Sequence, residues 1–134
     1  MNSEELLGIV GMSTMIVRAA DTSVASGVND LPVLSTSAAQ ALVESACSAA
    51  LAEHFAPGET SFTLSIQLEM ATSISIGEEA RAHVRLIEVN ENIVTFEAAI
   101  THLNRTIATA HVQRRLIDRL SFMARIAAER IVSA

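Results

Sequence analysis

The chain has 134 residues and a net charge of −6 at pH 7, with nine basic residues, all arginine, and neither tryptophan nor tyrosine. An acidic chain with so few aromatic rings lacks the charge and the stacking surfaces that nucleic-acid binding requires, so nucleic acid is not an expected partner. The absence of lysine excludes a Schiff-base or P-loop mechanism.

The composition also bounds the organisation of the chain. Its length fits a single domain, residues 1–134. No stretch approaches the roughly 18 consecutive apolar residues of a membrane span, and the acidic start lacks the basic residues of a signal peptide. We therefore expect a cytoplasmic protein without a membrane partner. The lone Cys47 is expected to be a buried structural thiol.

The first part of the chain predicts one strand and one long helix. Residues 1–12 show no clear period and are expected to form a loose arm, and residues 14–20 are typical of a strand. Ser37 followed by Gln40 three residues later is a capping-box pattern, so we expect the helix to begin there. It should continue to about residue 55, because a Pro-Gly pair follows.

Apolar residues lie on nearly every side of this helix, so other structure is expected to surround it. Glu44 stands out among them, because burying an unpaired charge is costly. Glu44 must therefore reach solvent or a partner, or have a chemical task.

The second part of the chain predicts four strands and a final helix. Alternating apolar and polar residues mark strands at residues 60–70, 79–89, 93–102 and 106–117. The first of these strands is expected to place on one face Phe62, Leu64, Ile66 and Leu68. A last helix, capped by Asp118, should reach about residue 132. Its apolar stripe is expected to hold Leu120, Met123, Ala127 and Ile131.

This order of elements predicts an α+β fold, in which a curved antiparallel sheet wraps around a long central helix and an extra helix follows at the C-terminus. Such a sheet has open edges, and open edges favour pairing with a second chain. We therefore expect a homodimer.

Several motifs occur in a fixed order along residues 21–47. Asp21-Thr22 comes first, then Gly27, then the VLST run of residues 33–36, then Glu44 eight residues after Thr36. This order resembles the fluoroacetyl-CoA thioesterase-like group of the hot-dog-fold thioesterases, over about residues 20–116. The resemblance implies a hot-dog fold, a homodimer with ligand pockets at the subunit boundary, an acyl-CoA substrate, and no cofactor other than the CoA within that substrate.

In that family a threonine, a glutamate and a histidine carry the chemistry. Thr36 and Glu44 match the first two. The histidine would fall around residues 68–70, where this chain has none. If Glu69 faces the pocket, it is a third candidate catalytic residue, because two carboxylates can share a proton. If Met70 faces the pocket instead, no titrating group remains at that place.

Thr36 and Glu44 have complementary chemistry for thioester hydrolysis. Thr36, beside the helix N-terminus, can donate to the thioester oxygen while free amides of the first turn polarise it. Glu44 can orient or deprotonate a water. Eight residues of helix advance about 12 Å, so both groups reach one carbonyl only with two subunits or an irregular backbone at Thr36. The alternative is that Thr36 merely caps the helix and Glu44 binds a buried backbone group.

The candidate substrate-binding residues are Val33, Ser35, Met70 and Arg114. Arg114 falls where the family has an arginine late in its last strand, and a guanidinium group suits the pyrophosphate of CoA. Arg114 and Arg115 alternate on a strand, so only one of them can line a given pocket. The alternative is that these arginines are solvated charges. No metal site is expected, because the four histidines form no ligand spacing.

Two functions are compatible with these residues. The first is an acyl-CoA thioesterase that hydrolyses short acyl-CoA thioesters, slowly because the histidine is missing. The second is a non-catalytic module that binds acyl-CoA or another small ligand. A hot-dog dehydratase is less favoured, because it needs a histidine opposite the carboxylate.

Overall fold

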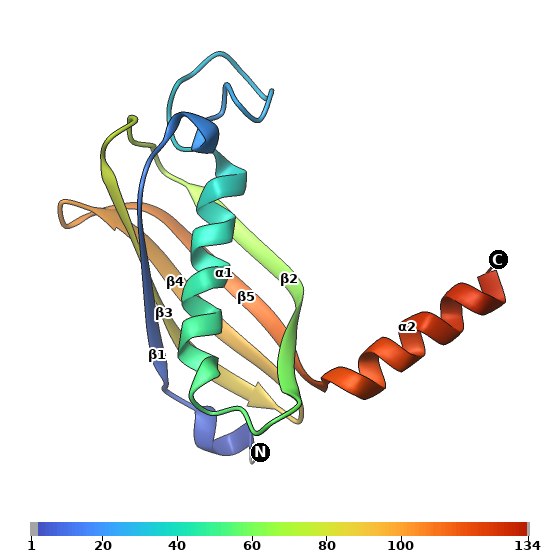
Figure 1. Cartoon of the computed structure of the whole chain (residues 1–134). Helices are drawn as coiled ribbons and strands as arrows, with labels where there is room; N and C mark the ends of the chain where they lie inside the picture. The colour runs from blue at the N-terminus through green and yellow to red at the C-terminus, as the bar shows by residue number, and fades with distance from the viewer. Residues whose placement is uncertain (1–2, 134) are drawn as a thin grey trace.

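A long helix packed across a five-stranded antiparallel sheet forms the body of the protein (Figure 1). The computed structural model describes residues 3–133, so Met1, Asn2 and Ala134 of the predicted single domain lie outside the described residues. The elements, in chain order, are η1 (Ser3–Leu6), β1 (Val10–Ile16), η2 (Ala19–Asp21), α1 (Thr36–Ala52), β2 (Glu59–Met70), β3 (Glu79–Asn90), β4 (Ile93–His102), β5 (Arg105–Asp118) and α2 (Arg119–Ser133), where η marks a 3-10 helix.

The strands pair in the order β1-β3-β4-β5-β2, and every pair is antiparallel. β1 and β2 each pair on one side only, so they are the two edges of the sheet. The predicted α+β fold, with a curved sheet around a central helix and an extra C-terminal helix, is confirmed. The strands predicted at 79–89, 93–102 and 106–117 agree with β3, β4 and β5 to within one residue at each end.

The core lies between the inner face of the sheet and one side of α1. β3 shows why the sequence folds this way, because from Glu79 to Leu86 its buried apolar residues alternate with exposed polar ones. The helix contributes Ala39, Leu42, Val43, Ala46, Cys47, Ala50 and Leu51. Each large apolar side chain buried here stabilises the fold by about 1.5–3 kcal/mol.

β1 approaches α1 most closely at Gly11. A Cβ atom at this position would clash with the carbonyl oxygen of Ala46 and lie 2.8 Å from the Cβ of Ala50. Both contacts belong to helix backbone or to its first side-chain atom, so neither can swing aside. Glycine is therefore required for the strand and the helix to pack at this distance.

Two expectations for the N-terminal part are wrong. β1 begins and ends four residues earlier than residues 14–20, because the chain leaves the sheet at Val17, whose amide donates to the carbonyl of Glu78 at 2.9 Å. The described residues before β1 are not a loose arm either. Leu6 is buried in the core, and the Gly8 amide donates to the carbonyl of Leu86 at 2.8 Å.

The N-cap of α1 lies two residues earlier than predicted. Its N-cap is Ser35 rather than Ser37, because the Ser35 hydroxyl accepts a hydrogen bond from the Ala38 amide at 3.0 Å. The helix ends at Ala52, three residues before the predicted end. Its outer side is open, with exposed small residues such as Ala41, so within one chain other structure does not surround the helix on every side.

β2 contains a β-bulge that the sequence pattern did not show. Thr63 pairs with Arg114 and Ser65 with Gln113, which leaves Leu64 without a partner residue. The bulge reverses the facing of the strand, so Phe62 lies on the outer face of the sheet while Ile66 and later apolar residues pack against the core. The expectation that Phe62, Leu64, Ile66 and Leu68 share one face is therefore wrong.

α2 leads away from the body, past the β2 edge (Figure 1). As predicted, Asp118 caps it, since its carboxylate accepts a hydrogen bond from the Ser121 amide at 2.9 Å. The contact with the body is made by Phe122, whose ring centroid lies 5.3 Å from that of Phe62 on β2. None of the helices within residues 3–133 combines the length and apolar character that crossing a membrane requires.

Candidate functional site

The segment that leads into α1 is fixed from two sides. The Ser35 amide donates to the carbonyl of Asp21, and the Leu34 amide donates to the carbonyl of Ile74, both at 2.9 Å. The Ser73 hydroxyl donates to the carbonyl of Leu34 at 2.8 Å. Residues 33–35 thus lie between the η2 turn and the connection that follows β2, and this arrangement determines where α1 begins.

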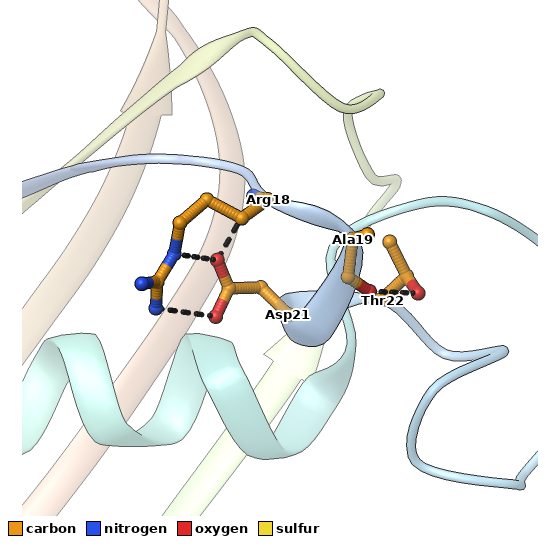
Figure 2. A network of polar contacts seen from close by, with 4 residues as sticks. All are labelled: Arg18, Ala19, Asp21 and Thr22. Atoms are coloured by element: carbon orange, nitrogen blue, oxygen red, sulfur yellow. Dashed lines mark hydrogen bonds and ion pairs between the residues drawn. The ribbon is translucent and has the colours of Figure 1, made fainter.

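A charged pair holds the η2 turn itself (Figure 2). The Asp21 carboxylate accepts hydrogen bonds from the Arg18 amide at 2.9 Å and from the Arg18 guanidinium at 3.2 and 3.3 Å. These bonds favour the ionised carboxylate and lower the pKa of Asp21. The Thr22 hydroxyl, alongside, donates to the carbonyl of Ala19 at 2.8 Å. The Asp21-Thr22 pair is therefore a structural support for the start of α1.

The first turn of α1 presents free donors. Ser35 satisfies the amides of Ala38, through its hydroxyl, and of Ala39, through its carbonyl. The amides of Thr36 and Ser37 donate to no group in the described part of the chain, and the exposed Thr36 hydroxyl has no described partner either. Three hydrogen-bond donors therefore converge at the exposed beginning of the helix.

Glu44 lies two turns further along α1, at the border of its buried face. The side chain is half-buried, between the fully buried Val43 and the exposed Ser45. Among residues 3–133 no hydrogen bond or ion pair is made by its carboxylate. The carboxylate is thus partly withdrawn from water and not committed to a structural contact.

Thr36 and Glu44 belong to the same regular helix, which fixes their separation. Eight residues of α-helix correspond to a rise of about 12 Å. The backbone at Thr36 is helical, so no irregular geometry brings the two side chains together. One chain does not assemble both groups around a single small carbonyl.

The structure separates Glu69 from Met70. Glu69 is exposed on the outer face of β2, whereas Met70 is half-buried and packs against the core on the face that carries α1. β2 runs back along α1, so Met70 lies at the end where the helix begins. At the place of the family histidine, the side chain on the helix side is therefore a thioether.

Arg114 lies under α1, buried with only 8% of its surface exposed. Its Nε donates to the Ser61 hydroxyl at 2.8 Å, and its Nη1 donates to the backbone carbonyl of Glu44 at 3.2 Å. Arg114 thus ties β5 and β2 to the helix at Glu44. The sequence left open which of Arg114 and Arg115 points inward, and Ser61 was not a candidate because nothing in its local pattern indicated this contact.

Cys47 follows Glu44 by one turn and is fully buried. Burial raises the pKa of its thiol to about 12, although the neighbouring Arg114 opposes part of this rise. The predicted buried structural thiol is confirmed. A thiol that stays protonated is a poor nucleophile.

The remaining candidates are placed as follows. Val33 is half-buried and forms an isolated bridge with Ser75, while the buried Ser35 uses its hydroxyl as the helix cap. His102 Nδ1 lies 2.8 Å from the carbonyl oxygen of Glu79, and its Nε2 lies 3.3 Å from the Glu78 carboxylate. Within residues 3–133 no three histidine, cysteine or acidic side chains gather as a metal site would require.

A hollow of about 770 Å³ lies on the opposite face of the sheet from α1. Small residues such as Ala99 and Thr109 form its floor, and His83, Arg85, Glu97 and His111 stand around it. It contains none of the candidate catalytic residues, so cavity size alone does not identify the site.

Comparison with known structures first defines the class of protein. The chain resembles a hot-dog-like protein from Thermanaerovibrio acidaminovorans, with 18% identity, TM-score 0.89, and coverage of 96% of this chain and 97% of the other. It also resembles a Thermus thermophilus hypothetical protein described as a thioesterase superfamily member, with 16% identity, TM-score 0.84, and 96% of each chain covered. These likenesses confirm the predicted hot-dog fold.

The family follows from the sequence itself. The profile of the fluoroacetyl-CoA-specific thioesterase family matches residues 15–120, most of the chain. The chain therefore belongs to this family. The fluoroacetyl-CoA thioesterase FlK shares 19% identity with it, with TM-score 0.82 and coverage of 91% of this chain and 95% of FlK. No curated protein matches the sequence.

Proposed function

We propose that this protein hydrolyses short acyl-CoA thioesters at a site formed between two subunits. The observation that carries this proposal is the carboxylate of Glu44, which is half-buried and has no hydrogen-bond or ion-pair partner in the described chain. A carboxylate held in this way is available to a water molecule and can act as a general base. Membership of the thioesterase family supports the reaction class.

In the proposed reaction Glu44 takes a proton from water while the water oxygen attacks the thioester carbon. The tetrahedral oxyanion accepts hydrogen bonds from the Thr36 hydroxyl and from the free amides of Thr36 and Ser37. The carbon–sulfur bond then breaks, CoA leaves as a thiolate, and the proton returns to it. No cofactor or metal takes part, and CoA enters only as part of the substrate.

The 12 Å rise between Thr36 and Glu44 requires the second subunit. A homodimer formed through the open edge of β2 would supply it, with Glu44 of one subunit acting opposite Thr36 of the other. Val33 and Ser35 would then contribute to substrate binding indirectly, because their backbone positions the first turn of α1. A cytoplasmic location belongs to this proposal and rests on the sequence pattern alone.

Met70 favours a second candidate function, which is binding of acyl-CoA without turnover. Its side chain lies on the helix side of β2 and cannot move a proton. General acid–base catalysis contributes about 10²–10⁴ in rate, so the loss of an imidazole here leaves a slow enzyme or none. Glu69 does not offer a replacement within its own chain, because it lies on the outer face.

Release of free CoA from a panel of short acyl-CoA thioesters, measured beside calorimetric binding, tests the proposal. Glu44→Gln should lower kcat at least tenfold with little change in affinity, because the amide keeps the shape and loses the base. Glu69→Gln is the matched control and should leave kcat unchanged. Binding without turnover would favour the second function, and turnover unaffected by Glu44→Gln would reject Glu44 as the base.

A further inference from the structure

The apolar side of α2 is exposed in the part of the chain that the structure describes, residues 3–133. Met123, Ile126, Ala127, Arg130 and Ile131 line a shallow hollow of about 430 Å³ on the surface of the helix. The side chains of Met123 and Ile131 are 55% and 77% exposed. An isolated helix of this length is only marginally stable in water, and an exposed apolar stripe marks an interaction surface.

Most of the stripe turns away from the chain's own sheet. Phe122 is the residue of α2 that touches β2, through its ring contact with Phe62. At about 100° per residue, Met123 lies about 100°, Ala127 about 140° and Ile131 about 180° around the helix axis from Phe122, while Ile126, at about 40°, borders the side that faces the sheet. The guanidinium of Arg125, 5.6 Å from the centre of the Phe122 ring, covers that ring on the side away from the stripe. Met123, Ala127 and Ile131 are therefore exposed on a side of α2 that residues 3–133 leave open to a partner.

The charge of α2 is opposite to that of the rest of the chain. Three arginines and Glu129 give the helix a net charge of +2, and since the whole chain carries −6, the other residues carry −8. A basic arm and an acidic body attract each other between two copies of the same chain. This complementarity identifies a second copy as the partner that suits the stripe.

The position of α2 fits the same partner. The helix extends beyond the β2 edge, which is one of the two open edges of the sheet and the one through which the proposed homodimer pairs (Figure 1). Its 15 residues span about 22 Å, equal to four or five strand spacings, so it reaches well across such a neighbour.

We infer that α2 is an intersubunit arm whose stripe of Met123, Ile126, Ala127 and Ile131 packs against a second copy of this chain. The inference rests on the homodimer of the proposed function and adds the surface that holds it together. The family match ends at residue 120, so the family assignment says nothing of the role of the arm.

A matched pair of substitutions tests the arm. Ala127→Glu places a charge in the stripe, and Ala128→Glu places the same charge one residue further on the exposed opposite side. Both variants have the same helix propensity, so they differ only in the face that is changed. In analytical ultracentrifugation Ala127→Glu should raise the dimer dissociation constant at least tenfold, and Ala128→Glu should change it less than twofold.

The possible outcomes test the intersubunit arm and the homodimer separately. A wild-type chain that is monomeric at micromolar concentration overturns both. A dimer that tolerates both substitutions overturns the arm alone. Circular dichroism confirms that both variants keep the sheet and helices, and hydrogen exchange should show α2 protected in the wild type and less protected in Ala127→Glu. Binding of the wild-type chain to vesicles of anionic phospholipid, lost in Ala127→Glu while the dimer persists, would assign the stripe to a membrane surface and reject the second copy.

Discussion

The buried thiol of Cys47 makes the stability of this protein depend on alkaline pH in a way that can be calculated. Burial raises its pKa from 9.0 to about 12 in the folded state. Below pH 9 the thiol is protonated in both states, so its contribution to stability is fully present. As the pH rises from 9 towards 12, the unfolded chain releases a proton that the folded chain retains, and stability is lost.

The magnitude follows from these two pKa values. Between pH 8 and pH 10.5 the free energy of unfolding should fall by about 2 kcal/mol, because one unit of differential titration corresponds to about 1.4 kcal/mol. The chain suits this measurement unusually well, since it has no lysine and no tyrosine to titrate in the same range.

Urea unfolding at pH 8, 9, 10 and 10.5 measures this effect, with Cys47→Ala as the control. The wild type should lose stability as the pH rises, and the variant should remain nearly flat, with a lower value at pH 8 because of the smaller side chain. Parallel curves for the two proteins would refute the reasoning and would mean that water reaches Cys47.

Three further outcomes are expected. Arg114→Met should lower the free energy of unfolding by about 1–3 kcal/mol, because buried charged hydrogen bonds are lost. It should also lower kcat while KM stays within twofold, with Arg115→Met as the control. A tenfold rise in KM would instead assign Arg114 to CoA binding. Gly11→Ala should lower the free energy of unfolding by about 1–3 kcal/mol, because its Cβ meets the carbonyl of Ala46; an unchanged melting temperature would contradict this packing. Met70→His should raise kcat by about 10²–10⁴ if the site needs only an imidazole, and an unchanged rate would mean that the site cannot use one.

Much of the fold could be predicted because its strands alternate cleanly. From Ala80 to Leu86 in β3 and from Val94 to Ile100 in β4 every second residue is apolar and buried, and this period of two indicates both the strand and its buried face. The start of α1 was harder, because Ser35 and Ser37 are both good caps and the local pattern favours Ser37. The choice depends on a bond from the Ser35 amide to the carbonyl of Asp21, which is a tertiary contact.

The candidate site could be predicted only in part for the same reason. Thr36 and Glu44 follow from their spacing along one helix, but the partners of Arg114 depend on the register of β5 against β2. The sequence showed that Arg114 and Arg115 point to opposite faces, and the structure shows that Arg114 is the inward one. Arg114, a candidate for contact with the pyrophosphate of CoA, thus lies beneath α1 and bonds to the backbone of Glu44.

The bulge at Leu64 shows how one residue governs the chemistry of a whole strand. Without an extra residue in β2, the side chains of Phe62 and Met70 would share a face, because their positions differ by eight residues, an even number. With the bulge, Phe62 turns outward, where it contacts Phe122 and sets the direction of α2, while Met70 stays against the core. The bulge therefore connects the two proposals, because it directs the arm toward a second copy and leaves a thioether on the helix side of the strand near Thr36.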